Sequence, residues 1–205
     1  RAVNSVLNQS YSNFELIVID DGSTDNGANE VQKFKDDRIK LIHQNNQGVS
    51  AARNRGIEEA KAELVAFLDA DDAWKPDFLE VIMILRKNYP QAGAYGTAYE
   101  MKNVKGKTIE PKFLGISNKS WEGIVKNYFQ SALISPLITS SSTAIPKNIF
   151  NIVGYFVENM PMGEDLDMWC RIALKFPIVF SNKICSIYYQ NADNRACNKL
   201  TDYTY

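Results

Sequence analysis

The sequence predicts an α/β fold with a mostly parallel central sheet flanked by helices. In the first half of the chain, apolar runs of strand length alternate with segments whose apolar residues recur at helical spacing. This alternation is typical of parallel strands joined by helical crossovers. Two apolar runs, 14–19 and 64–68, end directly in acidic residues. The length of 205 residues suits about one domain, so we expect residues 1–205 to form a single unit.

The order of the elements follows from apolar spacing, caps and helix breakers. We expect four helices in this part of the chain: at 2–7, from a cap at Ser23 or Thr24 to about residue 36, at about 49–60, and from Pro76 to about residue 89. We expect strands at 15–19, 39–43 and 64–68. Beyond residue 90 we expect strands at 92–101, 138–145 and 178–189, a helix or amphipathic segment at 121–133, and a helix at 164–176. Residues 1–100 would then bind one ligand, and residues 101–205 would complete the site.

Composition excludes several classes of protein. The net charge is −1 and no long Lys/Arg run occurs, so no nucleic-acid partner is expected. No apolar stretch reaches the roughly 20 residues that span a bilayer, so no transmembrane segment is expected. Cys170, Cys185 and Cys197 are widely spaced, which argues against a disulfide framework or a zinc site and favours a reducing, cytosolic setting. The only histidine, His43, lies in a predicted strand, and we expect it to be structural.

Two acidic clusters follow predicted strands, Asp20-Asp21-Gly22-Ser23 and Asp69-Ala70-Asp71-Asp72. The carboxyl ends of neighbouring strands in an open sheet border one crevice, so both clusters can converge on one ligand. Each cluster also has a simpler explanation, a strand-to-helix turn in the first case and an acidic turn in the second. The three carboxylates of the second cluster repel one another, which favours a divalent cation or ribose hydroxyls shared among them.

Two further segments carry charges at expected helix starts. Arg53 and Arg55 lie on the helix that follows Gly48, where they either form a solvated face or bind a diphosphate. Glu164 and Asp165 open a later helix, where acidic side chains also suit the helix dipole. The residue pattern by itself leaves both pairs of alternatives open.

The order of these motifs resembles the family 2 glycosyltransferases. The segments that carry the resemblance are 5–25, Asn46-Gln47-Gly48, Ala52-Arg53-Asn54, 67–72 and Gly163-Glu164-Asp165. The resemblance is specific from residue 5 to about 80, depends later mainly on Glu164-Asp165, and is thin between 100 and 160. It implies an inverting nucleotide-sugar enzyme of the GT-A fold, with a Rossmann-like nucleotide-binding half and an acceptor half.

The resemblance also implies roles for the donor-side residues. Asp20 and Asp21 would bind the base and ribose of the donor, a UDP-sugar, and Arg53 would help to hold the nucleotide. Asp71 is the first choice as ligand of Mn or Mg on the donor diphosphate. Asp69 and Asp72 would bind the metal or the ribose. Hard oxygen ligands suit these cations.

On the acceptor side, the resemblance implies that Asp165 is the general base for the acceptor hydroxyl and that Glu164 orients a sugar. A helix N-terminus would lower the pKa of Asp165 and burial would raise it, and the sequence does not decide between the two effects. A carbohydrate or lipid-linked acceptor, cell-envelope polysaccharide or glycolipid synthesis, and peripheral contact with the inner membrane face are expectations at the level of the family.

The chain departs from the family pattern in two places. Family members normally begin with a strand resembling Val-Ser-Val-Ile-Ile-Pro-Thr-Tyr-Asn, and this sequence starts after it. Many relatives carry Tyr-Arg-x-His after the last strand, where this chain has Tyr188-Tyr189-Gln190-Asn191. Two other classes stay open, a catalytically silent nucleotide-sugar-binding protein and a nucleotidyltransferase. Retention of Glu164-Asp165 favours the enzyme over the silent protein.

Overall fold

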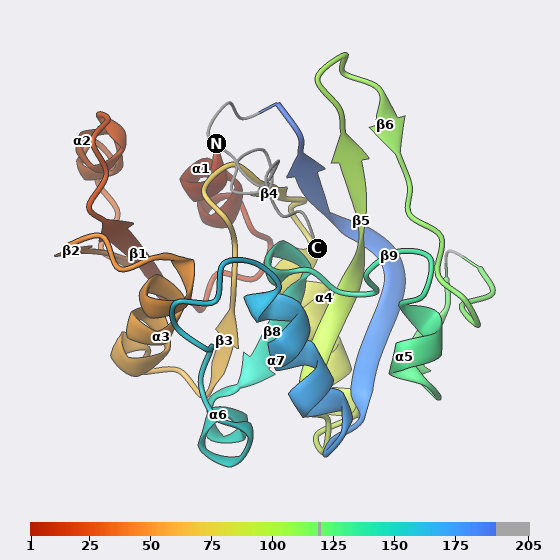
Figure 1. Ribbon diagram of the computed structural model, residues 1–205. Coiled ribbons are helices and arrows are strands. Elements are labelled where there is room, and N and C mark those ends of the chain that lie inside the picture. Colours follow the sequence, from red (N-terminus) through yellow and green to blue (C-terminus); the bar gives the residue numbers. More distant parts are fainter. Residues whose placement is uncertain (119, 192–205) are drawn as a thin grey trace, which may run out of the picture.

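The computed structural model describes residues 1–118 and 120–191. Its helices are α1 (Ala2–Leu7), α2 (Gly27–Gln32), α3 (Val49–Glu59), α4 (Phe78–Asn88), α5 (Tyr128–Ser131), α6 (Lys147–Val153) and α7 (Glu164–Ala173), and Ser140–Ser142 forms the 3-10 turn η1. Its strands are β1 (Leu16–Asp21), β2 (Ile39–Gln44), β3 (Leu64–Ala66), β4 (Ala73–Trp74), β5 (Ala94–Lys102), β6 (Thr108–Ile109), β7 (Glu122–Ile124), β8 (Thr143–Pro146) and β9 (Ile178–Tyr189). Figure 1 shows their arrangement.

The described strands form two sheets. Strands β1 and β2 pair in parallel, and the larger sheet has the order β3-β8-β5-β9-β4, with β6 on β5 and β7 on β9. The α/β class with flanking helices is confirmed, but the expected mostly parallel direction is wrong for the larger sheet, where only β5 and β9 pair in parallel among the described strands. Parallel neighbours need a crossover, usually helical, and α5, the only α-helix described between β5 and β8, has four residues. Strand β8 inserts antiparallel between β3 and β5.

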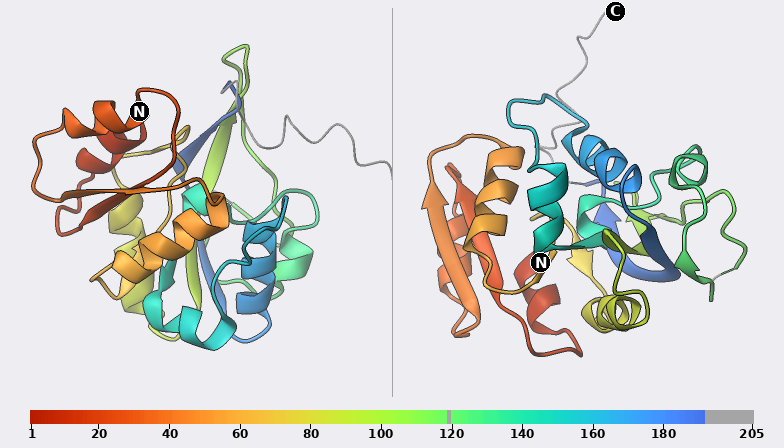
Figure 2. Two further views of the ribbon diagram at one scale, coloured as in Figure 1. Left: turned by 60° about the vertical axis from the view of Figure 1, so that its left-hand side comes forward. Right: turned by 90° about the horizontal axis from the view of Figure 1, so that it is seen from below.

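Two apolar cores lie on opposite faces of the larger sheet. Helices α6 and α7 cover one face, around the buried Phe150 and Trp169, and α1 and α4 cover the other, around Phe78 (Figure 2). Successive side chains of a strand point to opposite faces, so Ala94 of β5 belongs to the first core and Tyr95 to the second. None of the described helices is both long and apolar enough to span a bilayer.

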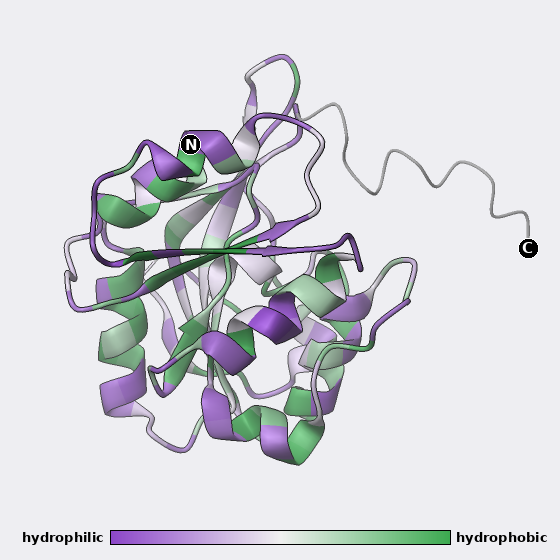
Figure 3. Cartoon of the chain, turned by 90° about the vertical axis from the view of Figure 1, so that its left-hand side faces the viewer, coloured by the Kyte–Doolittle hydropathy of each residue, from purple (hydrophilic) through white to green (hydrophobic). Residues whose placement is uncertain are grey.

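The two-stranded sheet ends in polar residues. The sheet lies to one side of the molecule against α3, and hydropathy colouring shows it apolar along its length and hydrophilic at one end (Figure 3). At this end the register places Asp20 opposite His43 and Asp21 opposite Gln44. The predicted carboxylates therefore do follow a strand that is largely apolar.

The prediction of a helix over 121–133 is wrong for most of its length. Residues 122–124 are β7, which pairs antiparallel with β9 and places Gly123 opposite Phe180, and α5 comprises only four residues. Gly123 is buried whereas its two strand neighbours are exposed, a period of two that a strand requires. The free edge of β9 satisfies the backbone here, and this non-local pairing overrides the local helical pattern.

Three smaller differences concern the bounds of elements and short elements that were not expected. The strand expected at 138–145 begins only at Thr143, because Thr139 and Ser142 cap the turn η1 reciprocally. The second helix begins after Asn26 rather than after Ser23 or Thr24. The sequence did not predict the short strands β4 and β6 or the helix α6. Cys197 lies outside the described residues.

Candidate active site

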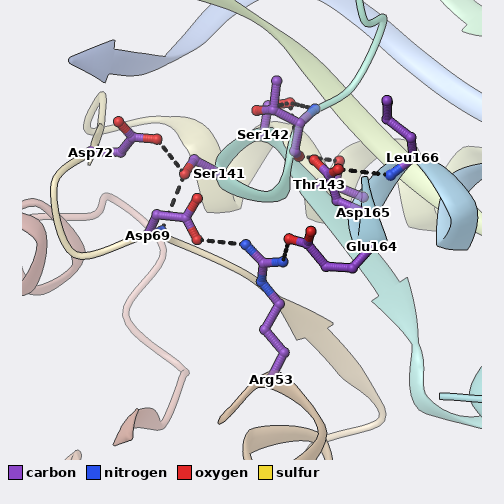
Figure 4. A network of polar contacts seen from close by, with 10 residues as sticks. Arg53, Asp69, Asp72, Ser141, Ser142, Thr143, Glu164, Asp165 and Leu166 are labelled. Atoms are coloured by element: carbon purple, nitrogen blue, oxygen red, sulfur yellow. Dashed lines mark hydrogen bonds and ion pairs between the residues drawn. The ribbon is translucent and has the colours of Figure 1, made fainter. Parts of the chain in front are cut away.

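An ion-pair network joins three of the predicted site residues (Figure 4). Arg53 of α3 donates from Nη1 to Glu164 Oε1 over 2.7 Å and from Nη2 to Asp69 Oδ1 over 2.9 Å. The side chains of Arg53 and Glu164 are only 11% and 13% exposed. Burial by itself lowers the pKa of Arg53, but the two carboxylates outweigh it and raise the pKa overall. One permanently charged guanidinium therefore fixes the start of α7 relative to the turn after β3.

Phe156, in the loop between α6 and α7, closes this network on one side. Its buried ring has its centroid 5.5 Å from the guanidinium carbon of Arg53 and meets Trp169 edge to face. Asn54 holds the backbone of Phe156 from both sides, because Nδ2 donates to its carbonyl and Oδ1 accepts from its amide, each over 2.9 Å. Helix α3 thus positions both Arg53 and the ring that packs beside it.

Replacing Asn54 by aspartate tests this attachment. A carboxylate accepts from the amide of Phe156 but cannot donate to its carbonyl, so two oxygens would face each other in a buried place. We expect the free energy of unfolding to fall by about 1–3 kcal/mol, measured by urea denaturation. The exposed Asn29→Asp is the matched control and should stay within about 0.5 kcal/mol of the wild type. Equal stability of the two variants would contradict a holding role for Asn54.

Asp165 lies in the first turn of α7, where its Oδ1 accepts a hydrogen bond from Leu166 N over 2.7 Å. Burial raises the pKa of Asp165, and the adjacent Glu164 raises it further, while the Leu166 amide and Arg53 act in the opposite direction. The sequence left open whether the helix N-terminus or burial would dominate the pKa of Asp165, and burial dominates. A carboxylate with a raised pKa, beside a charged network, is suited to general-base chemistry.

Asp72 lies beneath the surface of the acidic turn. It has no exposed surface, and it accepts hydrogen bonds from Ser141 Oγ over 2.6 Å and from Tyr189 N over 3.0 Å. Burial is the main cause that raises the pKa of Asp72 to about 7. Both carboxylate oxygens have partners inside the protein, an arrangement that disfavours the predicted contact with a metal or ribose.

Asp20 contacts Ser23 and His43 of β2, and Asp21 contacts the loop after β2. In the described part of the chain, neither is hydrogen-bonded to Arg53 or Asp69. Hydrogen bonds from Ser23 and then from His43 lower the pKa of Asp20, whose Oδ2 lies 2.8 Å from His43 Nδ1. Asp21 accepts from the side chain of Gln44 and from the backbone amides of Gln47 and Gly48, over 2.7–2.9 Å. Asp21 therefore shapes the loop, and binding of a donor by either residue stays a prediction.

Gly22 allows the chain to turn directly after these two carboxylates. Its φ is +71°, and a Cβ atom at this position would lie 2.8 Å from Asn46 N. Any other residue would therefore be strained in its backbone and would clash with the loop. This close approach keeps Asp21 against residues 46–48.

The three predicted metal ligands of the acidic turn differ in how accessible their carboxylates are. No group of three or more His, Cys, Asp or Glu side chains in residues 1–118 and 120–191 is arranged to hold a metal ion. Magnesium, however, is commonly bound by one or two carboxylates, with phosphate oxygens and water completing its shell. Asp69, 37% exposed at its side chain, and the partly exposed Asp71 fit this mode. Asp72 does not fit it.

Sequence reasoning missed three contributors to the site. Ser141 bridges Asp69 and Asp72, Asn54 holds Phe156, and His43 meets Asp20 rather than serving only the sheet. Asn54 and His43 could have been suspected, because each is a polar residue within or close to a motif that carries the family resemblance. For Ser141 the three consecutive serines gave no indication of which one would face the acidic turn.

The comparison with known families decides the relationship. The model of the family described as "Glycosyl transferase family 2" matches residues 1–143. The chain belongs to glycosyl transferase family 2. The glucosyltransferase WfgD of Escherichia coli, named as acting with UDP-Glc on α-D-GlcNAc-diphosphoundecaprenol, is 37% identical over 207 residues, covering 98% of this chain and 75% of WfgD. An uncharacterised glycosyltransferase of Rickettsia conorii is 36% identical over 177 residues, covering 85% of this chain.

Comparison with solved structures shows the same fold in another protein. The structure of Staphylococcus aureus TarS residues 1–349 in complex with UDP-GlcNAc superposes with a TM-score of 0.74 at 21% identity, covering all of this chain and 56% of TarS 1–349. The expected GT-A class is thereby confirmed. The matched region covers only 28% of the Rickettsia protein. In that relative, the region similar to this chain is part of a much longer polypeptide.

Proposed function

We propose that the chain transfers a sugar from a UDP-sugar to an acceptor hydroxyl with inversion at the anomeric carbon. The observation that carries this proposal is the Asp69–Arg53–Glu164 network, which joins the acidic turn after β3 to the helix start that bears Asp165. A donor between these two elements would have its diphosphate near the turn and its sugar near Asp165. The names of WfgD and of the TarS complex, both of which contain a UDP-sugar, support this class of donor.

Asp165 would act as the general base. Its carboxylate would accept the proton of the acceptor hydroxyl while that oxygen forms a bond to the anomeric carbon, and the bond from that carbon to the UDP oxygen would break. Glu164, held by Arg53, would orient the sugar without moving a proton. UDP leaves on the face opposite the attack, which inverts the configuration.

Asp71 and Asp69 are the residues that would hold Mn or Mg. When bound, such a cation supplies Lewis-acid stabilisation of the negative charge on the departing diphosphate. Asp71, the second aspartate of the Asp-x-Asp element, is the principal ligand in this proposal, with Asp69 beside it. Arg53 in turn keeps the carboxylate of Asp69 in one orientation.

A lipid-linked acceptor in cell-envelope synthesis is the acceptor class we propose. Support comes from WfgD, whose name contains a diphosphoundecaprenol-linked sugar, and from the putative teichuronic acid glycosyltransferase TuaG of Bacillus subtilis, 27% identical over 195 residues that cover 94% of this chain. Such an acceptor would place the transfer at a membrane surface.

A thermal-shift experiment tests the donor site. UDP at a hundred times its dissociation constant should stabilise the folded protein by about 2.7 kcal/mol, a shift in Tm of roughly 5–10 °C at this size. We expect the shift to require Mn and to disappear in Asp71→Asn. The exposed Asp37→Asn removes the same charge away from the turn and should keep the full shift. A wild-type protein that melts cooperatively and shows no shift with UDP, with or without Mn, would refute the proposed donor.

A further inference from the structure

The hydroxyl of Ser141 lies at the centre of a buried hydrogen-bond chain beneath the acidic turn (Figure 4). It donates to Asp72 Oδ2 over 2.6 Å and accepts from the backbone amide of Asp69 over 3.2 Å. Ser141 is 2% exposed and Asp72 is fully buried. One hydroxyl therefore holds the turn 69–72 at its first residue, through the backbone, and at its last, through the side chain.

The partners of this pair come from separate parts of the fold. Trp74 of β4 donates from its indole nitrogen to Ser141 O over 2.8 Å, and Tyr189 N of β9 donates to Asp72 Oδ1 over 3.0 Å. Within the turn, Asp72 N donates to Asp69 O over 3.0 Å. The turn, β4, η1 and the end of β9 are thus connected through the side chains of Ser141, Asp72 and Trp74. These contacts restrain both ends of the turn 69–72 relative to the sheet.

A buried carboxylate is a costly way to stabilise a fold. Removing a carboxylate from water costs several kcal/mol unless it is well paired, and here its described partners are a neutral hydroxyl and a backbone amide. Stability alone would favour a neutral side chain in this position. A carboxylate retained at such a cost is more readily understood as serving the geometry of the turn beside it.

We infer that Ser141 and Asp72 form a positioning pair that orients Asp69 and Asp71 toward the diphosphate of a nucleoside-diphosphate donor. This inference rests on the proposed function. The pair does not touch the donor. It fixes the backbone of the turn so that the two partly exposed carboxylates can hold a cation against the diphosphate. A displacement of about 1 Å at such a site costs up to 10²-fold in rate.

The test compares two serine-to-alanine variants that are adjacent in η1. Ser141→Ala removes the bridging hydroxyl, whereas Ser140→Ala is equally buried and its hydroxyl has no hydrogen-bond partner among the described residues. Titration calorimetry in the presence of Mn measures the affinities of UDP, which has the diphosphate, and of UMP, which lacks it. In Ser141→Ala we expect UDP to bind about tenfold more weakly and UMP to bind within twofold of the wild type. In Ser140→Ala we expect both affinities to be unchanged.

Amide hydrogen exchange provides a second measurement that needs no ligand. The amide of Asp69 should exchange faster in Ser141→Ala than in Ser140→Ala, because only the first variant removes its acceptor. Asp72→Asn keeps one oxygen that can accept from Tyr189 N and places an amide NH2 group beside Ser141 Oγ. We expect it to retain more UDP affinity than Asp72→Ala, which keeps neither contact.

The outcomes separate this inference from the proposed function. If wild-type protein binds UDP but Ser141→Ala keeps the same ratio of UDP to UMP affinity, the positioning role is wrong and the donor assignment stands. An equal loss of both nucleotides together with a lowered Tm would also refute it, since that pattern indicates general damage to the fold. If the wild-type protein binds neither nucleotide, the proposed donor fails and this inference fails with it.

Discussion

Replacement of Asp165 by asparagine is expected to lower kcat by about 10²- to 10⁴-fold while the affinity for UDP stays within about twofold of wild type. The amide has nearly the same shape but cannot accept the proton of the acceptor hydroxyl, and a positioned general base contributes roughly this factor. Initial rates of UDP release with acceptor present, together with UDP titrations, measure the two quantities.

Asp167→Asn is the matched control for this variant. It removes the same charge two residues further along α7, where Asp167 pairs with Arg171 at 2.7 Å. We expect at most a few-fold loss of rate. If Asp165→Asn transfers sugar at the rate of Asp167→Asn, Asp165 is not the base.

The raised pKa of Asp165 adds a dependence on pH. The base works only when ionised, so the rate should fall as the pH drops through its pKa, and this acid limb should lie above the ordinary aspartate pKa of 3.8. Stability depends on pH in the opposite direction from the rate, because the ionised form of Asp165 that catalysis needs is disfavoured in the folded protein. Because the folded pKa exceeds the unfolded one, the stabilising contribution is complete below the unfolded pKa and is lost as the pH rises through the folded pKa. At pH 8, therefore, Asp165→Asn should unfold no more easily than the wild type.

Replacement of Arg53 by methionine is expected to have the largest effect on stability. It leaves the carboxylates of Asp69 and Glu164 without the guanidinium that both contact, and breaking a buried ion pair by removing one partner costs about 3–5 kcal/mol. Sugar transfer should be lost as well, because the acidic turn and the start of α7 are no longer joined. Urea denaturation and transfer rates measure the two losses.

Arg55 provides the control on the same helix. Its side chain is 49% exposed and pairs with Glu59, a surface pair of the kind that contributes about 0–1 kcal/mol, so Arg55→Met should be nearly neutral. Adding Glu164→Gln to Arg53→Met removes one uncompensated carboxylate and should restore part of the stability but no activity. A fall in stability as small as that of Arg55→Met would show that the network is not a structural link.

The positions of the candidate site residues were predictable because they depend on short local patterns. Asp69 and Asp71 lie in the turn that follows β3, Asp165 lies in the first turn of α7, and β1, β2, α3 and α4 lie close to the expected ranges. In these segments, apolar periodicity and burial agree, so local preference and tertiary packing favour the same structure. The functional predictions for these residues remain for the proposed experiments.

The assignment of partners could not be predicted in this way. For Arg53 the sequence left two alternatives, a solvated helix face or a diphosphate ligand. In the structure, its guanidinium instead donates hydrogen bonds to two carboxylates of the protein. Asp72 and Asp71 are adjacent in sequence and equally acidic, yet only Asp72 is fully buried. A strand places successive side chains on opposite sides, but a turn has no such rule.

The sequence by itself therefore determined the α/β class, the family and the acidic residues at the strand and helix ends, since each depends on residues close together along the chain. Only the tertiary structure decided the direction of β8, the conversion of 122–124 into a strand, and the choice of Ser141 as the residue beneath the acidic turn. These features depend on contacts between residues some 55 to 80 positions apart. Such contacts form where a free strand edge or a buried polar group needs a hydrogen-bond partner, and the residues near it in sequence do not indicate which distant segment will supply that partner.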